Sequence, residues 1–143
     1  MRVLVDTSIW FEALRKAKRK TESIVVTELR NLILEHRVDV IGPVRQEILS
    51  DLREDAQFER LKQHLSAFPD LSLTTDDYVM AAKFFNTCRS KGVQGSNTDF
   101  LICAVAVRRQ LAIFTTDKDF SLFAKRLPIV LHKTRGSEPS NSG

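Results

Sequence analysis

Residues 2–10 read RVLVDTSIW, and this stretch indicates the type of fold. Residues 2–5 form a short, mostly apolar run, which is typical of a parallel strand buried on both faces. Asp6 ends this run, and Thr7 or Ser8 can cap a helix that starts directly afterwards. The stretch therefore predicts a buried first strand with an acidic side chain at its carboxyl end and a helix beginning beside that acid.

The rest of the chain alternates short apolar runs with segments in which apolar residues recur at helical spacing. This alternation predicts an α/β fold with three layers, α/β/α, around a mostly parallel central sheet of about five strands. Pro128 has no main-chain N–H, so it favours a sheet edge for the last strand. The predicted strands are residues 2–5, 38–41, 71–73, 112–115 and 127–131. The predicted helices start at Thr7 or Ser8, at Thr21 with Glu22, at Pro43, near residue 54, at Thr75, at Asn97 or Thr98, and at Phe120.

Length and composition indicate one domain. The chain has 143 residues, of which 43% are hydrophobic and 28% charged, values that are ordinary for a globular protein. No apolar run approaches the roughly 20 residues that a membrane-spanning helix needs, and we expect a cytoplasmic protein. The domain is predicted at residues 1–133, and residues 134–143, rich in Ser and Gly, are predicted to be a disordered tail.

The cysteines and histidines indicate neither a disulfide nor a zinc site. Cys88 and Cys103 both fall on helical patterns, where we expect small core thiols in a reducing compartment. His36, His64 and His132 are scattered without the spacing of metal ligands, so surface or loop positions account for them. Catalysis by a Cys–His or Ser–His pair is therefore not expected.

The net charge of +4 comes from one segment, residues 15–20, which holds five basic side chains. Without them the chain would carry slightly more acidic than basic residues. The segment is either a solvated turn between two helices or a patch that contacts RNA phosphates through Lys16, Lys18, Arg19 and Lys20. No aromatic residue is interleaved in it, so base stacking is not indicated there.

Four acidic residues lie where predicted elements begin or end, namely Asp6, Glu47, Asp99 and Asp117. Taken singly, each has an ordinary structural role open to it, as helix cap, surface residue, partner of a helix dipole or turn former. Taken together, they are expected to meet, because the carboxyl ends of parallel strands converge on one crevice. Clustered carboxylates repel one another, and Mg²⁺ or Mn²⁺, which prefer oxygen ligands, would relieve that repulsion. The sequence therefore predicts a divalent-cation pocket.

Four motifs in order along the chain carry a resemblance to a known family. They are VLVDTSIW at residues 3–10, Glu47 after Gly42 and Pro43, DFLICA at residues 99–104, and TTDKDF at residues 115–120. In this order they resemble the PIN-domain ribonucleases, and specifically the VapC toxins of bacterial toxin–antitoxin pairs. Each motif alone is weak, but together they span the chain from residue 2 to about residue 131.

The resemblance implies a PIN fold, a Mg²⁺- or Mn²⁺-dependent endoribonuclease that hydrolyses RNA through metal-activated water, inhibition by a VapB-type antitoxin, and a homodimer. It also implies site residues. Asp6, Glu47, Asp99 and Asp117 match the acidic quartet that binds metal and catalyses. Asp119 matches a further acid beside the metal, and Thr7 and Thr116 match hydroxyl positions that hold water or a phosphate oxygen. Cys103 departs from the alanine that is common in the family, which leaves the metal site unaffected.

Other functions remain open at this stage. A phosphatase with an Asp nucleophile after the first strand would need a second Asp at the position of Ser8, and a receiver-like signalling module would need an acidic pair that this chain lacks. A PIN-domain nuclease that processes RNA, or a catalytically idle RNA-binding module, shares the fold with the toxins. Intact acids argue against the idle module.

Overall fold

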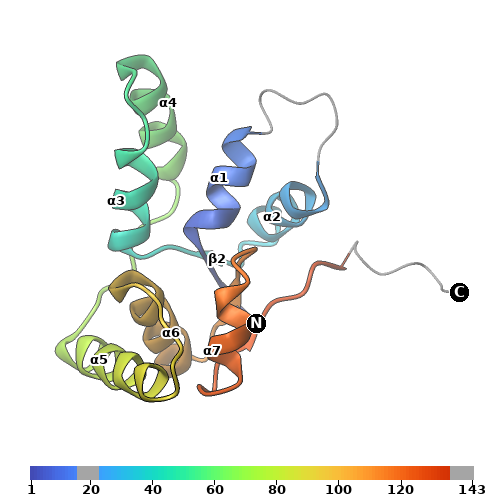
Figure 1. Ribbon diagram of the computed structural model, residues 1–143. Helices are drawn as coiled ribbons and strands as arrows, with labels where there is room; N and C mark the ends of the chain where they lie inside the picture. Colours follow the sequence, from blue (N-terminus) through green and yellow to red (C-terminus); the bar gives the residue numbers. More distant parts are fainter. Residues whose placement is uncertain (16–22, 136–143) are drawn as a thin grey trace, which may run out of the picture.

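The computed structural model describes residues 1–15 and 23–135 and contains a parallel four-stranded sheet (Figure 1). The strands are β1 (Val3–Val5), β2 (Val38–Asp39), β3 (Ala112–Phe114) and β4 (Val130–Leu131). Their order is β2-β1-β3-β4, so β4 is an edge strand, as Pro128 predicted. Val5 pairs with Phe114, which brings the carboxyl ends of β1 and β3 side by side.

The prediction of about five strands was one too many for the described residues. The segment at residues 71–73 is not a strand, and only a single bridge joins Asp70 to Val40, with one hydrogen bond of 2.9 Å from the Leu71 N–H to the Val40 carbonyl. Pairing stops there because the chain turns away at once to form the cap of the next helix at Thr74. The apolar alternation of the segment reflects partial burial and not sheet pairing.

Seven helices lie within the described ranges. The chain crosses from β2 over β1 to β3, so right-handed crossovers place helices on both faces of the sheet, as the predicted three layers require. The helices are α1 (Thr7–Arg15), α2 (Ile24–Leu34), α3 (Gly42–Ser50), α4 (Asp55–Leu65), α5 (Thr75–Ser90), α6 (Asn97–Arg109) and α7 (Asp119–Ala124). The first of these packs against α2 and α3, whereas α5 packs against α6, and Figure 1 shows the pair α5 and α6 well apart from α1 and α2. None of the helices in residues 1–15 and 23–135 has the length and apolar character that a membrane crossing requires.

The core centres on β1 and α6. All three residues of β1 are fully buried, and α6 buries seven consecutive residues from Phe100 to Ala106, which confirms its predicted central place. Cys88 and Cys103 are free and buried in this core, as expected. Burial raises the pKa of the Cys103 thiol, so it is an inert core group.

Serine side chains cap two of the helices. Ser96 caps α6 and accepts a hydrogen bond from the Asp99 N–H, so the predicted cap at Asn97 or Thr98 was wrong by one or two residues. Ser23 caps α2. The predicted start at residues 21 and 22 lies outside the described residues.

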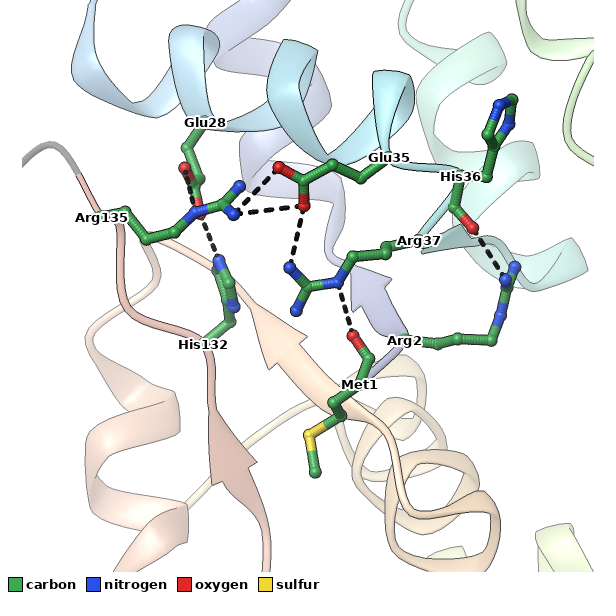
Figure 2. A network of polar contacts seen from close by, with 8 residues as sticks. All are labelled: Met1, Arg2, Glu28, Glu35, His36, Arg37, His132 and Arg135. Atoms are coloured by element: carbon green, nitrogen blue, oxygen red, sulfur yellow. Dashed lines mark hydrogen bonds and ion pairs between the residues drawn. The ribbon is translucent and has the colours of Figure 1, made fainter.

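The segment after β4 is tied to α2 by a polar network (Figure 2). Glu28, 2% exposed, lies 2.6 Å from Nε2 of His132 and accepts hydrogen bonds of 3.0 and 3.2 Å from Nε of Arg135. Arg135 also pairs with Glu35, which in turn pairs with Arg37. His132 thus lies in a loop, as expected, but its carboxylate partner was not evident from the sequence.

Candidate active site at the carboxyl end of the sheet

Asp6 is the buried centre of the site. It directly follows β1, is 5% exposed, and its main-chain carbonyl accepts the first hydrogen bond of α1 from the Ile9 N–H. Its Oδ2 accepts hydrogen bonds from the hydroxyls of Ser8 at 2.9 Å and Thr115 at 2.7 Å. Burial raises the pKa of Asp6, and these hydrogen bonds offset part of that rise. A buried carboxylate at a strand end is therefore held in one orientation by hydroxyl donors.

Asp117 lies in the loop between β3 and α7, next to Asp6. The Asp117 N–H donates to the Thr115 hydroxyl at 2.9 Å, and the Asp117 Oδ1 accepts the Asp119 N–H at 2.9 Å in an Asx turn. The loop also touches α1, because the Thr116 N–H donates to the Ser8 hydroxyl at 3.0 Å. Asp119 opens α7 with an exposed side chain. At this loop, the hydroxyl that reaches Asp6 is that of Thr115, while Thr116 contributes its main-chain N–H.

Asp99 approaches the same point from the first turn of α6. Its Oδ2 accepts the Ser96 N–H at 3.0 Å, while its own N–H donates to the Ser96 hydroxyl at 3.0 Å, forming a reciprocal capping box. Burial raises the pKa of Asp99, hydrogen bonds from Ser96 oppose the rise, and the charges of Asp6 and Asp117 add to it. Asp99 therefore senses the other two carboxylates electrostatically.

Glu47 joins the site through a different contact. It lies on the exposed side of α3, and its Oε1 accepts a 2.8 Å hydrogen bond from the hydroxyl of Thr7, which is 8% exposed. It also lines an open groove that reaches Thr98, the neighbour of Asp99. Thr7 thus anchors Glu47 to the end of β1, and within residues 1–15 and 23–135 the other carboxylate oxygen of Glu47 has no hydrogen bond.

The chemistry of these carboxylates can be compared with what a divalent cation requires. Within residues 1–15 and 23–135, no three His, Cys, Asp or Glu side chains are grouped closely enough to hold a metal ion directly. Mg²⁺, however, keeps several of its waters and takes only one or two carboxylates, and carboxylate oxygen is its preferred donor. Burial is the main cause of the raised pKa of Asp99, and the charges of Asp6 and Asp117 add to it; a cation would remove that added repulsion. The donor set therefore fits a hydrated Mg²⁺ or Mn²⁺ ion.

Comparison with known proteins agrees with this geometry. The pattern of the PIN domain matches residues 3–126. Ribonuclease VapC11 of Mycobacterium tuberculosis is 32% identical over 127 residues, which cover 86% of this chain and 92% of the relative. The chain belongs to the PIN-domain family, among the VapC ribonucleases. The predicted resemblance is thereby confirmed.

Two solved structures show the same PIN fold. VapBC2 from Rickettsia felis, bound to a DNA fragment from its promoter, superposes with a TM-score of 0.70 at 19% identity and covers 92% of this chain and 98% of that one. A toxin–antitoxin complex from Klebsiella pneumoniae gives a TM-score of 0.60 at 17% identity, covering 83% and 90%. At these identities the likeness shows the fold alone.

The sequence prediction of the site of this PIN domain omitted Ser8 and Thr115. Ser8 had a recognisable signal, since it lies two residues after Asp6, whereas nothing local separated Thr115 from Thr116. The predicted RNA contacts of the basic segment stay untested, because Lys16, Lys18, Arg19 and Lys20 lie outside the described residues.

The PIN domain also carries an apolar groove between α1, α2 and α4. Its floor includes Trp10, 7% exposed, whose ring lies 5.7 Å from that of Phe68. Leu34, at the edge of the groove, is 70% exposed. The groove is lined by Trp10, Ala13, Leu14, Val26, Leu29, Arg30, Ile33, Leu34, Leu61, His64, Leu65, Ala67 and Phe68. A surface of this composition is typical of a site for a partner segment.

Proposed function

We propose that this protein is a metal-dependent endoribonuclease and the toxin of a VapBC-type toxin–antitoxin pair. The observation that carries the proposal is that Asp6, after β1, Asp99, in α6, and Asp117, in the loop after β3, converge. They lie close enough for the charges of Asp6 and Asp117 to add to the rise that burial causes in the pKa of Asp99. Its relationship to VapC11, a ribonuclease, supports RNA as the substrate. We expect the protein to act in the cytoplasm, as the sequence predicted.

The acids divide the work between them. Asp6, Asp99 and Asp117 would hold the cation, Mg²⁺ or Mn²⁺, with Asp119 beside them. That ion, when bound, supplies an activated water and neutralises charge on the phosphodiester. Glu47, anchored by Thr7, takes a proton from the attacking water or orients it through its second carboxylate oxygen. Hydrolysis in this manner leaves a 5′-phosphate on the product.

A cleavage assay with total cellular RNA tests the proposal. The wild-type chain should cut RNA with Mg²⁺ or Mn²⁺ and not with EDTA, and Asp99→Asn should lose the activity. Asp55→Asn is a matched control, because Asp55 also lies in the first turn of a helix but is exposed and outside the site. It should cut like the wild type.

Different failures point to different conclusions. Equal cleavage by Asp99→Asn or cleavage in EDTA would refute the acidic site. No cleavage by the folded, antitoxin-free chain would favour an idle RNA-binding module. Products ending in 2′,3′-cyclic phosphate would exclude water as the nucleophile.

The antitoxin is the second expected partner, and the apolar groove is the surface we assign to it. Exposed Leu34 and the apolar floor around Trp10 suit an amphipathic antitoxin segment. Leu34→Asp should weaken inhibition by the antitoxin, while Leu122→Asp, an equally polar change at an exposed leucine outside the groove, should not. A homodimer also remains a prediction, measurable by analytical ultracentrifugation.

Contact between RNA and the basic segment is a separate proposal. Reversing the charge of Lys18 and Arg19 should weaken RNA binding by similar factors for all sequences and reduce its dependence on salt. If neither quantity changes relative to a reversal at exposed Lys83, residues 15–20 are a solvated turn.

A further inference from the structure

Two hydroxyl groups fill the space between Asp6 and the loop that carries Asp117. Ser8 donates to Asp6 Oδ2 at 2.9 Å and accepts the Thr116 N–H at 3.0 Å. Thr115 donates to the same Oδ2 at 2.7 Å and accepts the Asp117 N–H at 2.9 Å. The two hydroxyl oxygens lie 3.2 Å apart. Each hydroxyl therefore connects the Asp6 carboxylate to one main-chain N–H of the loop.

The number of available protons determines which groups in this arrangement donate and which accept. A hydroxyl has one proton to donate, and in the two shortest contacts both protons go to Asp6 Oδ2. Each hydroxyl proton therefore points to Asp6, and the lone pairs of the hydroxyl oxygens accept the loop N–H groups. An Asp6 carboxylate held in this way cannot rotate without breaking two hydrogen bonds to side chains and freeing the loop.

We propose that Ser8 and Thr115 act as a two-hydroxyl bridge that sets the position of Asp117 relative to Asp6. Asp117 lies on a loop, and its own contact with the Asp119 N–H is local, so it cannot fix the carboxylate against β1. The bridge provides that fixed reference. The bridge makes Ser8 and Thr115 positioning residues for the cation. That role in cation binding rests on the proposed function.

Thr116 supplies a natural comparison within the same loop. Its side chain is exposed and, among the described residues, has no hydrogen bond, whereas that of Thr115 makes two. If any threonine in this loop served equally, replacing either one would have the same effect. The bridge predicts that only Thr115 matters through its side chain.

The test uses Thr115→Val and Ser8→Ala, with Thr115→Ser as the variant that keeps the hydroxyl and Thr116→Val as the control. The first measurement is amide hydrogen exchange at Thr116 and Asp117 in metal-free protein. Thr115→Val should speed exchange at Asp117, and Ser8→Ala at Thr116. The second is Mn²⁺ affinity by calorimetry with the metal alone, which should fall about 10–100-fold in both variants. Thr115→Ser should stay within a few-fold of the wild type, and Thr116→Val should match it.

The outcomes separate this inference from the proposed function. If the wild type binds Mn²⁺ and Thr115→Val binds it equally well with unchanged loop exchange, the bridge is refuted and the function stands. If the wild type binds no Mn²⁺ but loop exchange changes as expected, the bridge stands and the metal-dependent function fails. Should Thr115→Val fold poorly, the contrast between Ser8→Ala and Thr116→Val still decides.

Discussion

Burial raises the pKa of Asp99, in the first turn of α6, and the charge of Asp6, at the end of β1, adds to that rise. The two residues are 93 positions apart in the sequence, and folding brings them together before any cation is present. The metal-free protein therefore stores electrostatic repulsion in its active site. This repulsion has a measurable effect on stability.

Asp99→Asn should stabilise the metal-free chain at pH 7. Asparagine keeps the acceptor that caps α6 but removes the charge. Because Asp99 is partly exposed, we expect a gain of about 0.5–1 kcal/mol. The folded pKa is raised, so the wild type loses stability as pH rises from the unfolded value near ~4 through the folded pKa. Urea unfolding across this pH range should show that the difference in the free energy of unfolding between variant and wild type grows as pH rises. A variant less stable than the wild type at pH 7 would contradict this prediction.

Asp77→Asn should destabilise the chain by about 2–4 kcal/mol, because it breaks a buried ion pair. Asp77 is fully buried and accepts hydrogen bonds of 2.8 Å from Arg108 and Arg109, which hold its pKa well below the usual value. A depressed pKa contributes stability above the unfolded pKa, and the contribution is lost as pH falls toward the folded one. The difference from the wild type should therefore shrink from pH 7 to pH 3. Asp76→Asn, at a 78% exposed neighbour 3.7 Å from Arg108, should have little effect.

Glu28→Ala should cost about 2–3 kcal/mol and loosen the segment after β4. The change leaves His132 and Arg135 without their common acceptor (Figure 2). Hydrogen exchange should increase at the His132 N–H, which donates to the Ile113 carbonyl at 2.7 Å. Glu59→Ala is the control, because the Glu59 carboxylate is 66% exposed and lies 3.7 Å from Lys62. Equal effects of the two changes would show that the network contributes nothing.

Gly95→Ala should destabilise by about 1–3 kcal/mol through overpacking. A Cβ atom at residue 95 would lie 2.5 Å from the Phe123 ring and 3.0 Å from that of Phe100. Both rings are buried and cannot retreat. Gly42→Ala, where the nearest atom is 3.9 Å away, should be neutral or slightly stabilising. Thermal melts of the two variants test this directly, and similar melting temperatures would refute it.

Local chemistry explains which parts of the fold could be predicted from the sequence. The first strand, Asp6 and the start of the first helix are consecutive in the chain, so residues 2–10 alone were enough to predict them. The segment at residues 71–73 has strand-like alternation, but pairing depends on a neighbour's register and on where the chain must turn. Its single bridge to Val40 could not be foreseen.

The same distinction holds for the site. Asp99 and Asp117 could be located because a helix start and a strand end are local signals. Which hydroxyl faces Asp6 depends on the twist of the loop after β3, so Thr115 and Thr116 could not be told apart by composition. The partner of Asp77 lies on another helix, and only the packing of α5 on α6 reveals it.

The placement of Trp10 gives the groove an intrinsic fluorescence signal. It is the only tryptophan in the chain, and its indole Nε1 has no hydrogen-bond partner within the described ranges. The indole is 7% exposed and lies among apolar side chains, and no second tryptophan contributes to the emission. A segment that enters the groove must change the surroundings of this one ring, so an unlabelled titration followed by intrinsic fluorescence can report groove occupancy in real time.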